Sequence, residues 1–129
     1  MNLPTLSALV LVGALSFAIL FEVAVVAGAP FGAFTAGGKY PGKLPAKARL
    51  QRFWFIFGWS ILLGHYLAQA GVLTPLLSAS LNEAVNWVFA STLAMAIYFN
   101  SRSNSVKERA LWMPVVMVML ICALLVAVK

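Results

Sequence analysis

Acidic residues are scarce in this chain, which has only three of them, Glu22, Glu83 and Glu108, among 129 residues. It also has a single histidine and a single cysteine, Cys122. One cysteine excludes an intramolecular disulfide, and one histidine without a neighbouring carboxylate or thiol is too few ligands for a metal. No nucleophile with its base and no pair of catalytic acids can be assembled. We therefore expect no enzymatic activity, no cofactor and no metal.

Apolar residues are abundant instead, at 63% of the chain, while charged residues make up 9%. In soluble domains, about 45–50% of the residues are apolar and about 25% are charged. The apolar residues fall in four runs, each roughly 27 to 33 Å long as a helix, which matches the hydrocarbon core of a bilayer. The fold class predicted is therefore all-α, a transmembrane four-helix bundle in one integral-membrane domain, residues 1–129, with spans at about 6–27, 53–73, 81–99 and 111–128.

The basic residues predict the orientation of these spans, because cytoplasmic loops collect lysine and arginine. They lie between the first and second runs and between the third and fourth, and the segments on the other side have almost none. Both basic loops should therefore be inside and both termini outside. Because the net charge of +6 sits in short loops rather than on one exposed face, it does not indicate binding to nucleic acid. The basic residues are Lys39, Lys43, Lys47, Arg49 and Arg52 in the first loop and Arg102, Lys107 and Arg109 in the second.

Glu22 is the one charge within the first apolar run, where an ionised side chain is costly unless it is paired or used. It shares a helix face with Ala14 and Ala18, and small residues mark helix contacts in lipid. Glu22 should therefore point into the bundle. Two interpretations follow. Either Arg49 or Arg52 reaches in to neutralise it and fix the packing, or Glu22 stays unpaired and exchanges a proton for a cationic substrate.

His65 and Gln69 form a second polar layer, one helical turn apart in the second run. With Asn86 they make up, beside Glu22, a candidate intramembrane polar or proton site. The alternative is that a neutral His65 holds helices together through a hydrogen bond to Asn86 or Ser16, as polar side chains commonly do between membrane helices.

Helix starts are predicted from two Ser-x-x-Glu patterns, Ser80 to Glu83 and Ser105 to Glu108. An alternative, earlier start of the third helix has Thr74 as its cap and Pro75 at the first helical position. In such a capping box two side chains satisfy free amides at a helix start. Pro114 lies inside the fourth run, where its missing amide predicts a kink.

The first basic loop is rich in glycine and proline between residues 28 and 49, so it is not a continuous helix. It resembles a phosphate-binding loop only superficially, because Tyr40 replaces the Ser or Thr that binds magnesium. Lysines at the inner leaflet, with Phe31 and Phe34 dipping into it, suit anionic lipid head groups. The alternative is topology-setting charge on an ordered turn structure. The candidate lipid contacts are Lys39, Lys43, Lys47, Arg49 and Arg52.

A resemblance extends over most of the chain. It is carried by Glu22, Gly28-Ala29-Pro30-Phe31-Gly32, Gly37-Gly38, Gly42-Lys43-Leu44-Pro45 and Arg49, and then by Asn100-Ser101-Arg102-Ser103, Glu108-Arg109 and Trp112. This pattern resembles a group of small, uncharacterised bacterial four-span membrane proteins. The resemblance implies a multi-pass protein of the bacterial inner membrane and brings no activity with it.

A looser likeness is to the small multidrug resistance transporters, through residues 18–23 around Glu22 and through Pro114 with residues 119–123. It implies a proton-coupled transporter of small cations with Glu22 as the coupling residue, although the first loop here is longer than in that family. The expected function is a structural or accessory one, as a homo-oligomer or in a larger membrane complex. Proton-coupled transport is the alternative.

Overall fold

The computed structural model describes residues 1–129 and is entirely helical, without strands, which confirms the all-α prediction. It contains four long helices and, in the first connection, two short 3-10 helices. In chain order these are α1 (Leu3–Val26), η1 (Gly32–Phe34), η2 (Ala36–Gly38), α2 (Ala46–Gln69), α3 (Ala79–Ser101) and α4 (Val106–Ala127).

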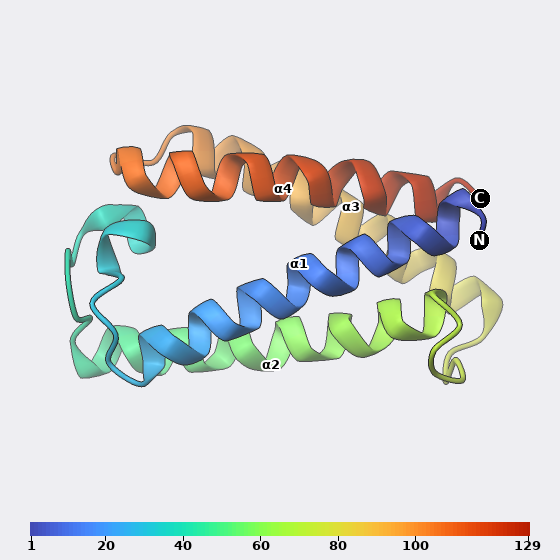
Figure 1. The fold of residues 1–129 in the computed structure, drawn as a ribbon, viewed down its shortest axis with the longest axis horizontal. Helices are drawn as coiled ribbons and strands as arrows, with labels where there is room; N and C mark the ends of the chain where they lie inside the picture. The colour runs from blue at the N-terminus through green and yellow to red at the C-terminus, as the bar shows by residue number, and fades with distance from the viewer.

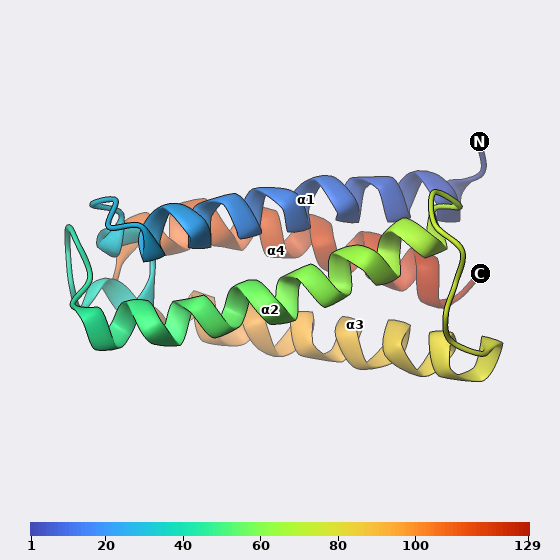
Figure 2. The same ribbon diagram turned by 90° about the horizontal axis from the view of Figure 1, so that it is seen from below.

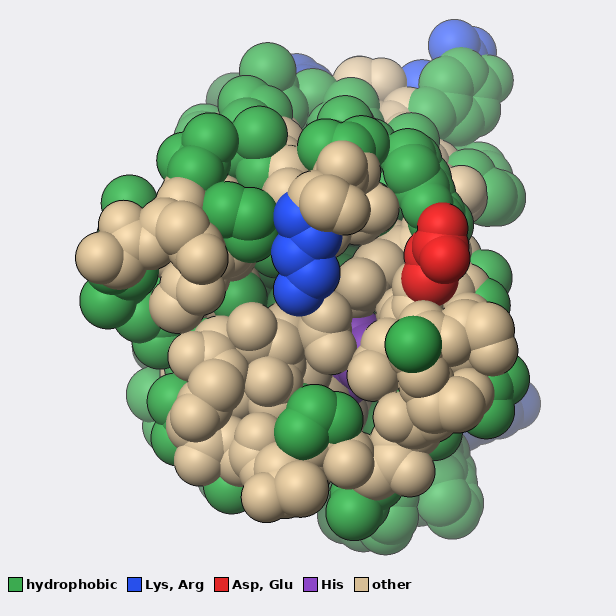
Figure 3. All heavy atoms as spheres, turned by 90° about the vertical axis from the view of Figure 1, so that its right-hand side faces the viewer, with side chains coloured by type: hydrophobic (Ala, Val, Ile, Leu, Met, Phe, Trp, Pro, Cys, Tyr) green, Lys and Arg blue, Asp and Glu red, His purple; other side chains and the backbone are tan.

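The four long helices run up and down along one axis (Figure 1). Both termini and the α2–α3 connection lie at one end, which we call the terminal end. The α1–α2 and α3–α4 connections lie at the other, the loop end (Figures 1 and 2). Since the two basic segments are these connections, eight of the nine lysines and arginines gather at the loop end or on the adjoining helix turns, and Lys129 is the exception. Figure 3 looks onto the terminal end, where the single histidine is visible below the surface between one basic and one acidic side chain.

The helices pack as α2 on α1, α1 on α4 and α4 on α3. The α2 and α3 helices meet mainly through side chains near the terminal end, where the rings of Tyr66 and Phe89 lie 5.5 Å apart. The core along the bundle consists of Ala8, Leu11, Leu15, Tyr66, Phe89, Ala90, Leu93, Val116, Met119, Ala123 and Val126.

The helices begin before the apolar runs that predicted them, most of all at α2. This helix begins at Ala46 rather than Phe53 and ends at Gln69 rather than Leu73. Its first two turns carry Lys47 and Arg49, which are compatible with a helix but do not belong to an apolar run. Gly71, with φ +80°, follows its end in the left-handed conformation that favours glycine.

Of the two predicted capping boxes, the first is wrong, and only the serine cap of the second is confirmed. At α3 the capping residue is Ser78, whose hydroxyl accepts from the Leu81 amide at 3.3 Å, and not Ser80. At α4, Ser105 is the cap and accepts from the Glu108 amide at 3.2 Å. The helix continues through Pro114 to Ala127.

Much of the apolar surface of the bundle is exposed. Only 21 of the 129 residues are buried, and each of the four long helices exposes large apolar side chains. By length and composition, α1 and α4 are apolar enough to cross a membrane. The helices α2 and α3 do not meet the same criterion.

Candidate functional site

An ion pair near the loop end joins α1 to α2. The Arg52 Nε donates to Glu22 Oε2 at 2.8 Å, and its Nη2 donates to Glu22 Oε1. Glu22 is 3% exposed, so its charge is matched by a bidentate partner inside the bundle. Arg49, the other arginine considered from the sequence, instead donates through Nη1 to the Val26 carbonyl at 3.5 Å.

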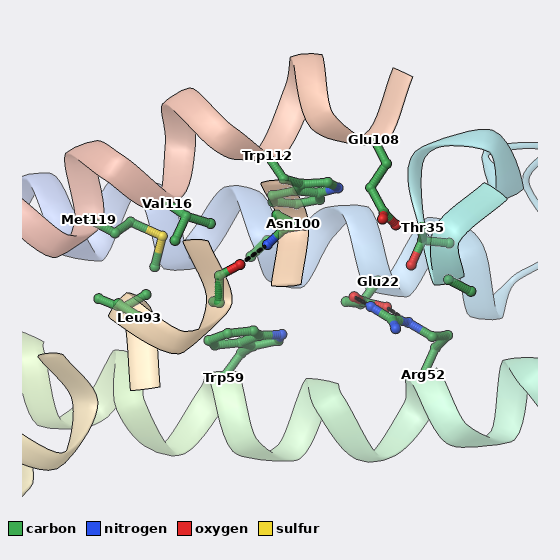
Figure 4. A pocket seen from close by; sticks show the side chains of 13 residues that line it. Glu22, Thr35, Arg52, Trp59, Leu93, Asn100, Glu108, Trp112, Val116 and Met119 are labelled. Carbon is green, nitrogen blue, oxygen red and sulfur yellow. Dashed lines mark hydrogen bonds and ion pairs between the residues drawn. The ribbon is translucent and has the colours of Figure 1, made fainter. Parts of the chain in front are cut away.

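A cavity of about 190 Å³ lies beside this pair. All four long helices and the first connection contribute to its wall, as Figure 4 shows. The wall is polar toward the loop end and apolar toward the middle of the bundle. Its residues are Ala18, Glu22, Thr35, Ala36, Arg52, Trp59, Leu93, Ala96, Asn100, Glu108, Trp112, Val116 and Met119.

Glu108 is a member of this wall that the sequence analysis treated only as a helix cap. It is 8% exposed, and its Oε2 accepts from the Gly37 amide at 3.2 Å, so the side chain faces the first connection instead of completing a capping box. The pair of Glu22 and Arg52 is the only salt bridge of the chain, so no cation neutralises Glu108. The helical spacing of Glu108 and Trp112 was the signal in the sequence that could have placed both on one inward face.

The glycine loop, residues 28–45, folds against the start of α4 and closes the loop end of the cavity. The Trp112 Nε1 donates to the Phe34 carbonyl at 2.8 Å, and the Ser105 hydroxyl donates to the Ala33 carbonyl. Thr35 is buried under this contact and lines the cavity. A Cβ built on Gly32 would lie 1.6 Å from the Tyr40 carbonyl oxygen, so glycine is required there.

The five basic residues predicted to contact lipid divide into two groups. Lys39, Lys43 and Lys47 are exposed at the loop end, while Arg49 and Arg52 bond to α1 within the bundle. The lysines are therefore free to meet anionic groups, and the two arginines have partners already. The predicted membrane-dipping aromatics differ as well. Phe31 is 39% exposed, and its ring stacks on that of Phe21 with 6.2 Å between the centroids. Phe34 is partly buried against a small apolar cluster of Phe21, Val25 and Leu44.

A separate network of hydrogen bonds lies toward the terminal end. His65 Nε2 and Asn86 Oδ1 are 2.7 Å apart, and Asn86 Nδ2 donates to Gln69 Oε1 at 3.2 Å. Gln69 Oε1 also accepts from Lys129 Nζ at 3.4 Å. Ser16, the other partner considered for His65, donates to the Val12 carbonyl of its own helix. Glu22, His65 and Asn86 therefore do not form one site, because Glu22 belongs to the cavity and the other two to this network.

Tyr66 follows His65 in α2 and is fully buried, with its ring 4.9 Å from the imidazole. Its hydroxyl has no hydrogen-bond partner, which sequence reasoning did not anticipate. Buried hydroxyl groups normally have one.

These two polar sites can bind a ligand and can hold neighbouring helices together through an ion pair and hydrogen bonds. The chain brings together no group of three histidine, cysteine or acidic side chains around which a metal could be held. Comparison of the chain with protein-family models, with curated proteins and with solved structures gave no match.

Proposed function

We propose that this chain is a four-span integral protein of the bacterial inner membrane with a structural or accessory role. The observation that carries the membrane part is the exposed apolar surface shared by all four helices. A soluble bundle would turn such side chains inward, whereas lipid tails solvate them. Examples from each helix are Leu20 and Val23 in α1, Phe57 and Ile61 in α2, Val88 and Met95 in α3, and Val118 and Ile121 in α4.

The helices α2 and α3 are less apolar than α1 and α4, and the placement of their polar residues supports their crossing the membrane too. His65 and Asn86 bond to one another across the helix interface, and Arg52 bonds to Glu22. Polar side chains within a bilayer are tolerated where they face the bundle and pair with each other. The large exposed side chains of these helices are mainly aromatic and aliphatic.

The positive-inside rule then orients the bundle. Because the basic residues lie toward the loop end, we propose that this end faces the cytoplasm and that both termini lie outside. Trp54 is 63% exposed two residues after Arg52, where the aromatic belt of the inner interface would be.

The structural or accessory role is supported by the use of the polar residues. The Glu22–Arg52 pair ties α1 to α2, and Asn86 ties α3 to α2, so these groups serve helix packing. Proton-coupled transport through Glu22 would need a carboxylate that is free to exchange a proton, and Glu22 has a bidentate partner. The apolar surface leaves room for a homo-oligomer or a larger membrane complex.

Topology reporters test the membrane proposal. Fusions after Lys43 and after Lys129 should report the cytoplasm and the periplasm respectively, and the chain should fractionate with inner membranes. A periplasmic report at Lys43, or a freely soluble chain, would overturn it. Cross-linking in membranes tests the accessory role, which predicts a discrete homo-oligomer or a defined co-purifying protein; monomers alone would reject it.

Anionic lipid contact is a further part of this proposal, since Lys39, Lys43 and Lys47 are exposed at the proposed inner surface. Replacing Lys39 and Lys43 with glutamine should lower the amount of anionic lipid that copurifies. The matched control is Lys129→Gln at the terminal end, which should leave it unchanged. Equal retention in all three proteins would reject lipid contact by the lysines.

A further inference from the structure

The cavity at the loop end has an unbalanced charge. Glu22 and Arg52 pair within it, which leaves the Glu108 carboxyl group, 8% exposed, without a salt-bridge partner. The neighbouring cations do not reach it, because Lys107 lies over the Phe34 ring, with its Nζ 5.9 Å from the ring centroid, and Arg109 donates to the Ser103 carbonyl. A buried carboxylate with no cationic partner favours a positively charged ligand.

Two indole rings flank the same space. Figure 4 shows Trp59 of α2 and Trp112 of α4 on opposite sides of the cavity, with Asn100 of α3 between them. The hydrogen bond from Trp112 to the Phe34 carbonyl holds one of these rings in place. The face of an indole ring is the aromatic surface that attracts cations best. Beyond the rings, Leu93 and Met119 provide an apolar wall.

We propose that this cavity binds a small organic cation, an ammonium group that carries an apolar or aromatic substituent. Glu108 is the counter-ion, Trp59 and Trp112 contact the cation and its substituent, and the apolar wall accommodates the rest. A bare metal ion would leave the aromatic and aliphatic part of the wall unused. The volume of about 190 Å³ is below the roughly 300–1,000 Å³ of pockets that hold drug-sized ligands, so it restricts the ligand to a small molecule.

The surroundings of Trp59 indicate how such a ligand enters. Trp59 also lines an apolar groove between α2 and α3, together with Leu62, Val88 and Phe89. Because α2 and α3 meet mainly toward the terminal end, the side of the cavity next to Trp59 is its weakest wall. An amphipathic cation would approach from this groove, while the glycine loop closes the loop end.

Calorimetric titration of the purified full-length chain in detergent micelles tests the proposal with benzyltrimethylammonium as the probe. Wild type should bind it, and Glu108→Gln should bind it about tenfold more weakly or worse, because the charge is lost while the acceptor for the Gly37 amide is kept. The matched control is Glu83→Gln, an exposed glutamate at the terminal end, which should bind like wild type. The uncharged N,N-dimethylbenzamide, of similar size, should bind about tenfold more weakly than the cation.

Absence of binding to wild type at millimolar probe, equal affinity in Glu108→Gln, or equal affinity for the uncharged compound would each overturn the inference. If Glu108→Gln does not fold, Ala96→Leu provides the second test, since a larger side chain in the wall should abolish binding. Trp59→Phe should weaken binding a few-fold, and Trp54→Phe, on the exposed face of α2, should not. Retained affinity in Ala96→Leu and Trp59→Phe would also overturn it.

The ammonium group of a phosphatidylethanolamine head group has the same chemistry as a free amine. Titration in nanodiscs of phosphatidylglycerol alone and with phosphatidylethanolamine distinguishes the sources. Weaker binding of the probe in the mixed lipid identifies the head group as the natural occupant, and unchanged binding identifies a free organic cation. The inference is independent of the topology proposed above, because a four-span chain that binds no cation would contradict only the inference.

Discussion

The two polar regions of the bundle bury polar side chains in different ways, one through an ion pair and the other through hydrogen bonds. At the loop end, charges are buried as the Glu22–Arg52 pair, and the glycine loop contributes backbone groups that bond to α4. At the terminal end, His65, Asn86 and Gln69 form a network of hydrogen bonds without an ion pair, Lys129 donates to Gln69, and the α2–α3 connection is exposed throughout residues 71–78. Burying charge demands exact partners and an ordered loop, whereas neutral hydrogen bonds between helices do not. The loop end should therefore be the more sensitive to substitution.

Removing one member of the buried pair should have the largest effect. Arg52→Ala leaves Glu22 without its partner and should lower the free energy of unfolding by about 3 kcal/mol, measured by detergent-induced unfolding in mixed micelles. Arg102→Ala, an exposed arginine at the same end, is the control and should change it by less than about 0.5 kcal/mol. If Arg52→Ala is as stable as the control, the pair does not stabilise the bundle.

Gly32→Ala should have the next largest effect, because its Cβ would lie 1.6 Å from the Tyr40 carbonyl oxygen. We expect a loss of about 2 kcal/mol and faster protease cleavage within residues 28–45, as the glycine loop leaves α4. The control is Gly58→Ala in α2, where no atom lies within 4 Å of the added Cβ. That change should be neutral or stabilising, since alanine favours helix. Wild-type cleavage rates in Gly32→Ala would refute a docked loop.

Asn86→Ala tests the hydrogen-bond network at the terminal end and should lower the free energy of unfolding by less than Arg52→Ala or Gly32→Ala does. It removes the bonds to His65 and Gln69, and hydrogen bonds between membrane helices contribute about 1 kcal/mol. The free energy of unfolding should fall by about that amount, against no measurable change for the exposed Asn104→Ala. A loss as large as that of Arg52→Ala would contradict the contrast between the two ends.

Tyr66→Phe should have the smallest effect, and in the opposite direction. The Tyr66 hydroxyl is buried without a partner, so its removal should raise the free energy of unfolding by up to about 1 kcal/mol. Tyr98→Phe, on the exposed face of α3, should leave stability unchanged. A destabilised Tyr66→Phe would show that the hydroxyl has a hydrogen-bond partner.

The number of helices and the inward direction of the Glu22 side chain were predictable from the sequence, because both depend on local chemistry. Long apolar runs separated by glycine, proline and charge specify helices, and a lone carboxylate in such a run is either paired with a cation or used in function. The sequence offered Arg49 and Arg52 as partners of Glu22, beside the alternative that Glu22 is unpaired. It did not choose between them, because the choice depends on how α2 rotates against α1.

Helix starts were less predictable. Apolar runs did not predict the early start of α2 at Ala46, and the Ser-x-x-Glu motif did not predict the cap at Ser78. Polar turns extend helices without adding to the apolar signal, and neighbouring serines compete for the same cap.

By itself, the sequence determined the four helices, the gathering of basic residues toward one end and the inward direction of Glu22. Only the tertiary structure decided that Arg52 is its partner, that Asn86 rather than Ser16 bonds to His65, and that Glu108 and two tryptophans face one cavity. The physical reason is the distance along the sequence between the residues that interact. Helix formation and charge placement are fixed by residues a few positions apart, whereas Glu108 meets Gly37 across 71 positions, through packing that no local pattern encodes.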